Sequence, residues 1–160
     1  MELWFNSFPR EFGLKRTIAK DKNEFINLIN TYNGSVNCYS NVYKITEDRK
    51  YGDTIDKLFF DLDNPKTCWE ATKRMHKVLC EQDIKHVVLL SGGGYHVYVF
   101  IKEDNLMNKK HAIANAQHEI AKMCEVTIGE PKVADIDRHV IGDIARIARI
   151  PNTWNISRKR

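Results

Sequence analysis

The segment Lys57-Leu58-Phe59-Phe60-Asp61-Leu62-Asp63 constrains the fold of this chain more than any other. A short run of bulky apolar residues is typical of a buried β-strand, in which residues two apart face the same way. The carboxylates of Asp61 and Asp63 therefore leave one face of the strand, with Cα atoms roughly 6.5 Å apart. Leu58, Phe60 and Leu62 face the other way, toward a core. The sequence thus predicts a strand that carries two acidic side chains at its end.

This acidic pair has two interpretations. Adjacent carboxylates repel each other unless a cation lies between them, and hard oxygen ligands suit Mg²⁺ or Mn²⁺. These are the ions of phosphoryl and nucleotidyl transfer. In the other interpretation, the two acids simply end a solvated strand that leads into the turn at Asn64-Pro65. Other parts of the sequence have to decide between the two.

Length and composition favour one globular domain that spans residues 1–160. Of the 160 residues, 42% are apolar and 29% are charged, as in ordinary globular proteins. No window is apolar enough to cross a membrane and the first residues lack a signal-peptide pattern, so we expect a cytoplasmic protein without a membrane partner. The net charge of +4 permits a polyanionic partner without requiring one. The four cysteines form no Cys-x-x-Cys pair, so we expect reduced, mostly buried thiols and no zinc site.

Hydrophobic periodicity predicts three helices among several strands. The helices are expected over residues 21–32, 67–82 and 108–124. Strands are expected over residues 36–45, 57–63, 86–90 and 95–101, followed by a mixture of strand and short helix over 132–155. The histidines at positions 76, 86, 111 and 118 show no shared spacing of metal ligands, so surface or helix positions are expected for them. Strands that alternate with helices indicate an α+β or α/β layered fold around one sheet.

A second candidate site is the glycine-rich segment Ser91-Gly92-Gly93-Gly94-Tyr95-His96. Backbone N–H groups of such a turn can hold phosphate oxygens. His96, at the start of the next strand, could donate a hydrogen bond to a phosphate or stabilise developing charge. The alternative is a flexible hairpin turn followed by a histidine with an internal partner.

A third candidate segment lies near the end of the chain. Asp137, in Asp135-Ile136-Asp137-Arg138, would complete a three-carboxylate metal site with Asp61 and Asp63. Arg146 and Arg149 are three residues apart, so on a helix they would share a face and contact the same phosphates. The alternative is a salt-bridged surface helix.

In this order, the three segments resemble the motifs of the archaeo-eukaryotic primase superfamily, the small catalytic primase subunits and the plasmid and viral prim-pols. Asp61 and Asp63 match its first motif, an apolar run that ends in Asp-x-Asp. Ser91 to His96 match the second motif, a serine, a glycine-rich turn and a histidine ahead of an apolar strand. Asp137, Arg149 and Pro151 match the third, an aspartate followed twelve residues later by a basic residue and then x-Pro. The resemblance covers roughly residues 9 to 155.

The resemblance implies a single α+β domain resembling the primase catalytic core, with an RRM-like antiparallel sheet packed with helices and a small N-terminal αβ layer. It implies a template-directed nucleotidyltransferase, a DNA primase or primase-polymerase core that makes or extends primers from nucleoside triphosphates. Single-stranded DNA template and primer would be its partners, with a larger primase subunit or a helicase as further candidates. Two Mg²⁺ or Mn²⁺ ions would be held by the catalytic carboxylates of Asp61, Asp63 and Asp137.

The same resemblance suggests nucleotide-binding residues, which are Ser91, Gly92, Gly93, His96, Arg146 and Arg149. Arg10, in an Arg-Glu-Phe element found near the start of many family members, is a further candidate, as are Arg16 and Asn155. The sequence departs from the family in three ways. Glycines stand in the second motif where several primases have arginines, Asn155 stands where some have histidine, and no cysteine cluster corresponds to their zinc-bearing knob.

Two other functions fit parts of the sequence. Glycosyltransferases that use nucleotide sugars also bind Mn²⁺ through an apolar-flanked Asp-x-Asp, but this reading leaves the second and third segments unexplained. A non-catalytic relative of primase would bind nucleotide or single-stranded nucleic acid within a replication complex. The presence of all three candidate metal-binding acids argues against that alternative.

Overall fold

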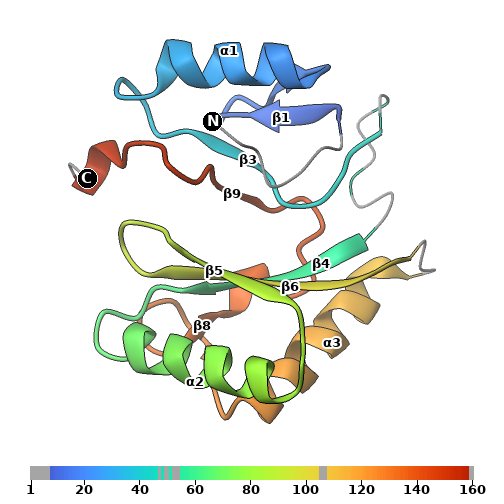
Figure 1. Ribbon diagram of the computed structural model, residues 1–160, viewed down its shortest axis with the longest axis vertical. Helices are drawn as coiled ribbons and strands as arrows, with labels where there is room; N and C mark the ends of the chain where they lie inside the picture. Colours follow the sequence, from blue (N-terminus) through green and yellow to red (C-terminus); the bar gives the residue numbers. More distant parts are fainter. Residues whose placement is uncertain (1–7, 47, 49–50, 52–54, 105–107, 159–160) are drawn as a thin grey trace. The chain divides into compact units, whose positions relative to one another are not determined.

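The computed structural model of the protein describes residues 8–46, 48, 51, 55–104 and 108–158. The chain divides into two compact units. Figure 1 colours the chain from its N-terminus in blue to its C-terminus in red. Unit 1 consists of residues 1–53 and 145–160, and unit 2 consists of residues 54–144. Each unit combines an antiparallel sheet with helices, so the α+β class expected from the sequence is confirmed. In the described part of the chain, no helix has the length and apolar character needed to span a membrane.

Unit 1 is built on a four-stranded antiparallel sheet with the strand order β2-β1-β3-β9. Its strands are β1 (Arg10–Phe12), β2 (Thr17–Ala19), β3 (Tyr39–Asn41) and β9 (Ile147–Arg149). One helix, α1 (Lys22–Tyr32), packs against β1 and β2, and a short 3-10 helix, η2 (Ile156–Arg158), lies near the end of the chain. The carboxylate of Asp21 caps α1 by accepting a hydrogen bond of 2.9 Å from the Glu24 amide. The predicted helix at residues 21–32 is therefore confirmed, with Asp21 as its cap.

The strand predicted over residues 36–45 is much shorter in the structure, where β3 covers Tyr39–Asn41. The reason lies in the Asn41 side chain, which is buried and bonds to the backbone. Its Oδ1 accepts a hydrogen bond of 2.9 Å from the Glu11 amide, and its Nδ2 donates to the Tyr43 carbonyl. Side-chain bonds of this kind offer the backbone an alternative to the strand ladder, so the strand ends here.

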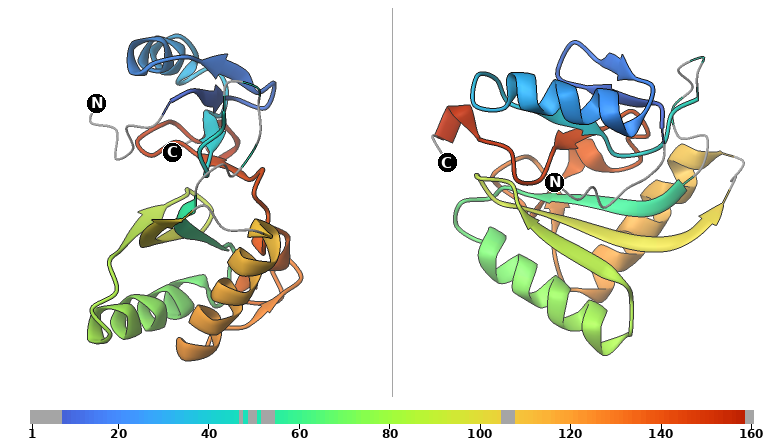
Figure 2. Two further views of the ribbon diagram at one scale, coloured as in Figure 1. Left: turned by 90° about the vertical axis from the view of Figure 1, so that its right-hand side faces the viewer. Right: turned by 45° about the horizontal axis from the view of Figure 1, so that its top comes forward.

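Unit 2 has a three-stranded antiparallel sheet with the strand order β4-β6-β5. Its strands are β4 (Ile55–Leu62), β5 (His86–Leu90) and β6 (Tyr95–Asp104). The helices α2 (Cys68–Glu81) and α3 (Lys109–Met123) lie on the same face of this sheet (Figures 1 and 2). A short parallel pair, β7 (Ile128–Gly129) and β8 (Ile136–Asp137), precedes the 3-10 helix η1 (Arg138–Val140).

The order of elements in unit 2 is RRM-like from β4 to α3. The elements β4, α2, β5, β6 and α3 follow one another, and β6 lies between β4 and β5 in the sheet. After α3 the chain forms β7 and then β8, which pairs with β7 and packs against β4. The helices predicted over residues 67–82 and 108–124 are confirmed, with their first and last predicted residues acting as caps.

The alternation predicted for β4 is also confirmed on its core side. Leu58, Phe60 and Leu62 are at most 2% exposed. Tyr95, the cross-strand partner of Leu62, contacts the ring of Trp69 in α2, with ring centroids 5.7 Å apart. The face that carries these apolar residues is therefore the face covered by the helices. Asp61 belongs to the opposite face, because side chains alternate along a strand.

Candidate active site

The end of β4 positions the acidic pair. Asp61 is the last residue but one of β4, and Asp63 directly follows the strand. The strand register places Asp61 directly opposite His96 of β6. The Nε2 atom of His96 lies 3.7 Å from Oδ1 of Asp61, and both side chains are largely buried. The imidazole also meets the ring of Phe59 edge to face, with centroids 5.1 Å apart, which limits its rotation.

Asp63 carries an unusual carboxylate oxygen. Its Oδ1 is buried and has no hydrogen-bond partner among the residues that the structure describes. The following residue is fixed, because Asn64 donates to the Val133 carbonyl at 2.9 Å and its own carbonyl accepts from the Cys68 amide at 2.9 Å. A buried carboxylate oxygen without a partner is costly unless a cation approaches it. Carboxylate oxygens are ligands of Mg²⁺ and Mn²⁺, so the residues present fit such an ion.

The glycine turn packs directly against this end of β4. A Cβ atom on Gly94 would lie 2.0 Å from the Leu62 carbonyl oxygen and 2.9 Å from the Asp63 Cα, so no larger residue fits there. The hydroxyl of Ser91 accepts hydrogen bonds from the amides of Gly94 at 3.0 Å and Gly93 at 3.4 Å. The sequence analysis expected the amides of this turn to bind phosphate oxygens. In the structure the amides of Gly93 and Gly94 both donate to the Ser91 hydroxyl, so a bound phosphate oxygen would have to replace that hydroxyl.

Gly94 itself was missed as a site residue by the sequence analysis. Its role comes from the close approach of two backbones, and that approach depends on the pairing of β4 with β6. The available signal was a third glycine at the start of a strand, a position where close backbone contact is common.

Asp137 comes to the flank of β4, because it lies on β8 and β8 packs against that strand. Its Oδ1 accepts hydrogen bonds from the backbone amide of His139 at 2.8 Å and lies 2.8 Å from His139 Nδ1. Asp137 thereby caps the short helix η1. Its side chain is 12% exposed, so it keeps access to an additional ligand.

Asp135, two residues earlier, has a different environment. Its Oδ2 accepts hydrogen bonds from the amide and hydroxyl of Thr127 at 2.9 and 3.0 Å, and Arg74 lies 3.7 Å away. Burial alone raises the pKa of the carboxyl, but the hydrogen bonds from Thr127 and the charge of Arg74 lower the pKa overall. Asp135 is therefore a structural carboxylate, and its partners leave Asp137 as the candidate for chemistry.

The structure gathers four of the predicted features at one end of β4. These are Asp61, Asp63, His96 and the glycine turn that begins at Ser91. Within the described residues, the oxygens of Asp61, Asp63 and Asp137 do not form a set that lies within 4.8 Å of one another.

The helix assumed for Arg146 and Arg149 is absent, and that expectation was wrong. Arg149 ends the strand β9, whose Ala148 lies opposite Ser40 of β3, so the two arginines do not share a helical face. The guanidinium of Arg149 lies 5.2 Å from the ring centroid of Tyr39 and donates to Asn37 Oδ1 at 3.1 Å.

Arg10 and Asn155, two further candidates in unit 1, have internal partners. Arg10 is 1% exposed and donates to the Asn41 carbonyl at 2.7 Å. The buried Asn155 accepts a hydrogen bond of 3.2 Å from the amide of Arg158. Such contacts hold the sheet and the C-terminal segment of unit 1 in place.

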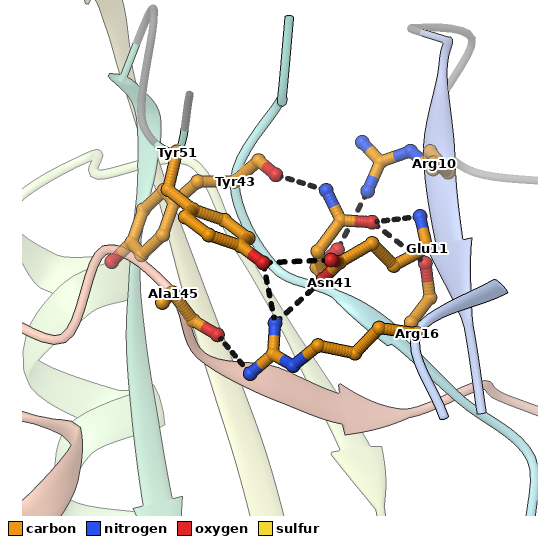
Figure 3. A network of polar contacts seen from close by, with 8 residues as sticks. Arg10, Glu11, Arg16, Asn41, Tyr43, Tyr51 and Ala145 are labelled. Atoms are coloured by element: carbon orange, nitrogen blue, oxygen red, sulfur yellow. Dashed lines mark hydrogen bonds and ion pairs between the residues drawn. The ribbon is translucent and has the colours of Figure 1, made fainter. Parts of the chain in front are cut away.

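Arg16 lies in a network with Glu11, Tyr51 and Ala145, which Figure 3 shows from close by. Its guanidinium donates to Glu11 Oε2 at 2.6 Å and to the Ala145 carbonyl at 2.9 Å. Burial alone lowers the pKa of Arg16, but the hydrogen bond and charge of Glu11 raise it overall. About a third of the Arg16 side chain stays exposed, at 34%.

Comparisons with known proteins address the fold. No protein-family model matches the chain, and no curated protein matches its sequence. Among solved structures, the fold is similar to that of a DNA-bound polymerase domain. That structure is the polymerase domain from Mycobacterium tuberculosis Ligase D in complex with DNA, with a TM-score of 0.58 and 11% sequence identity. The match covers 99% of this chain and 61% of the other, so the chain spans less than two thirds of that domain's length.

Proposed function

We propose that the protein is the catalytic core of a template-directed nucleotidyltransferase, a DNA primase or primase-polymerase that makes or extends primers from nucleoside triphosphates. The buried, unpartnered Oδ1 of Asp63 beside Asp61 is the observation that carries this proposal. Similarity to the fold of a polymerase domain supports it. Single-stranded template and primer DNA would be its macromolecular partners.

Asp61, Asp63 and Asp137 would hold two Mg²⁺ or Mn²⁺ ions. When bound, such ions stabilise the attacking and leaving oxygens of the transfer. The two carboxylates are held in a fixed geometry. Asn64 bonds to Val133 and so fixes the chain next to Asp63, and the pairing of β4 with β6 fixes Asp61. Preformed ligands of this kind need little reorganisation during the reaction.

The residues around the carboxylates would bind the triphosphate. His96 lies beside the acidic pair, with its Nε2 atom 3.7 Å from Oδ1 of Asp61. An N–H group at Nε2 of His96 would donate a hydrogen bond to a phosphate oxygen. The amides of Gly93 and Gly94 would add two donors by exchanging the Ser91 hydroxyl for a charged acceptor, which forms the stronger hydrogen bond.

Arg146 and Arg149, both in unit 1, remain proposed phosphate-binding residues. Both tyrosine stacking and a hydrogen bond to Asn37 hold the Arg149 guanidinium in one orientation. A guanidinium with restricted rotation loses less entropy when it binds a phosphate.

Primer synthesis and primer extension on templates of defined sequence test the proposal. Assays with deoxynucleotides or ribonucleotides, and with Mg²⁺ or Mn²⁺, would also reveal which substrate and ion the protein prefers. We expect incorporation that follows the template and falls by about 100-fold or more in Asp61→Asn. Asp83→Asn is the matched control, because Asp83 is an exposed carboxylate in the turn after α2. Template-independent products, or equal rates in wild type and Asp61→Asn, would refute the proposal.

A further inference from the structure

Three potential metal ligands meet on the helix-covered face of unit 2. His76 and Cys80 belong to α2, and His86 belongs to β5. One ligand atom from each of the three residues lies within 4.8 Å of the other two. Nδ1 of His76 lies 2.8 Å from Nε2 of His86 and 3.8 Å from the Cys80 sulfur. Within the described part of the chain, no other group of three histidine, cysteine or acidic side chains has ligand atoms this close together.

Local structure holds the three residues together. His76 and Cys80 are four residues apart, so they lie one above the other on α2. A tight turn then joins α2 to β5, in which the Ile84 amide donates to the Leu79 carbonyl at 2.8 Å. His86, the first residue of β5, pairs with Val99 of β6, so the sheet fixes its position.

A backbone hydrogen bond orients the His86 ring. Its Nδ1 lies 2.7 Å from the Ile84 carbonyl oxygen, which can only accept, so Nδ1 carries the proton and donates. Nε2 of His86 therefore keeps its lone pair and accepts a hydrogen bond of 2.8 Å from Nδ1 of His76. A metal ion bound by both nitrogens would replace this proton, which His76 can carry on Nε2 instead. Metal-binding histidines commonly show this arrangement, in which the second ring nitrogen donates to a carbonyl or carboxylate.

The distances come close to those of a tetrahedral metal site. Around zinc, bonds of about 2.0–2.1 Å to nitrogen and 2.3 Å to sulfur put two nitrogens about 3.3 Å apart and a nitrogen and a sulfur about 3.6 Å apart. The nitrogens here are somewhat closer, at 2.8 Å, and the sulfur slightly farther, at 3.8 Å. Small rotations of the exposed His76 and Cys80 side chains would correct both differences.

We propose that His76, Cys80 and His86 bind one transition-metal ion of the zinc class, with water as a fourth ligand. Two imidazoles and a thiolate suit zinc, cobalt, nickel or copper and do not suit Mg²⁺. A groove of about 540 Å³ beside these residues, also lined by Trp69 and Val87, leaves room for the water. The ion would join the end of α2 to β5, and coordination would release the thiol proton.

The expectation of no zinc rested on the absence of a Cys-x-x-Cys pair and on histidines that show no shared spacing of metal ligands. A site of the form His-x3-Cys-x5-His has no Cys-x-x-Cys pair, and its third ligand depends on how β5 packs against α2. The proposal is independent of the nucleotidyltransferase activity, since it involves neither Asp61 nor Asp63.

Cobalt and zinc binding to the untagged protein test this site. Co²⁺ added to the reduced protein should produce a thiolate-to-cobalt charge-transfer band that saturates at one equivalent of Co²⁺. Zn²⁺ should displace the Co²⁺ and abolish the band. Cys80→Ser should abolish the charge-transfer band, and His86→Gln should weaken Zn²⁺ binding at least about tenfold. Circular dichroism would verify that both variants stay folded.

Two matched controls use residues outside the site. Cys68→Ser removes another thiol of α2, and His111→Gln removes an exposed imidazole of α3. Both should bind Zn²⁺ like the wild type. The proposal is overturned if the wild type gives no charge-transfer band, if Cys80→Ser keeps it, or if Cys68→Ser loses it.

Discussion

At the scale of single residues, Asp135 and Asp137 show how two carboxylates two positions apart acquire different roles. The sequence presents them as equivalent acids beside Ile136. In the structure, Oδ2 of Asp135 accepts hydrogen bonds from the amide and hydroxyl of Thr127 and lies 3.7 Å from the Arg74 guanidinium. Asp137 is bonded by its own helix turn and by His139. The difference depends on contacts with residues eight and sixty-one positions away, so it could not be predicted from local sequence.

The lowered pKa of Asp135 predicts a specific loss of stability in acid. Its pKa in the folded protein lies below the reference value of 3.8, so the unfolded chain binds more protons at low pH. The stabilisation is therefore fully present above about pH 5 and disappears as the pH falls through the folded pKa. Asp135→Asn should lower the melting temperature by a few degrees at pH 6, consistent with about 1 kcal/mol, and by less near pH 3.

Thermal unfolding followed by circular dichroism between pH 3 and pH 6 measures this effect. The exposed Asp83→Asn variant is the control and should follow the wild type throughout. A melting-temperature difference between Asp135→Asn and wild type that stayed constant over this range would contradict the assignment.

At the scale of secondary-structure elements, the amphipathic helices were predictable and the short strands were not. Helices α1, α2 and α3 have caps or apolar periodicity that the sequence displays directly. Strand β9 has three residues, too few for any period, and it forms because it pairs with β3 more than 100 positions earlier in the chain. The error about Arg146 and Arg149 follows from this, since their spacing had suggested a helix.

The junction between β4 and the glycine turn makes a prediction at the same scale. Gly94→Ala would bring a methyl group 2.0 Å from the Leu62 carbonyl oxygen, and neither strand can move away without breaking the pairing of Leu62 with Tyr95. Overpacking of this kind costs about 1–3 kcal/mol. Chemical denaturation should therefore show a clear loss of stability in Gly94→Ala. Gly93→Ala is the control, because Gly93 is exposed and does not adopt a positive φ angle. Equal stability of the two variants would show that the turn does not press on β4.

At the scale of the whole molecule, the order of three motifs predicted the kind of fold better than any single segment did. The RRM-like order of elements in unit 2 and the additional αβ layer of unit 1 both agree with that expectation. The division into two compact units, with unit 1 assembled from both ends of the chain, was not predicted. Such an assembly depends on β3 and β9 meeting, and composition gives no sign of it. The cluster of His76, Cys80 and His86 was also missed, because it depends on how β5 packs against α2.

The most direct test of the central claim is the rate of single-nucleotide incorporation in three isosteric variants. Asp63→Asn and Asp137→Asn should each lose about 100-fold or more of the wild-type rate, because each removes a proposed metal-binding charge. Asp135→Asn, measured at a temperature where it is fully folded, should keep a rate close to that of the wild type, since Asp135 is engaged by Thr127 and Arg74. A wild-type rate in Asp63→Asn would contradict the claim that the acidic pair at the end of β4 carries the catalytic metal site.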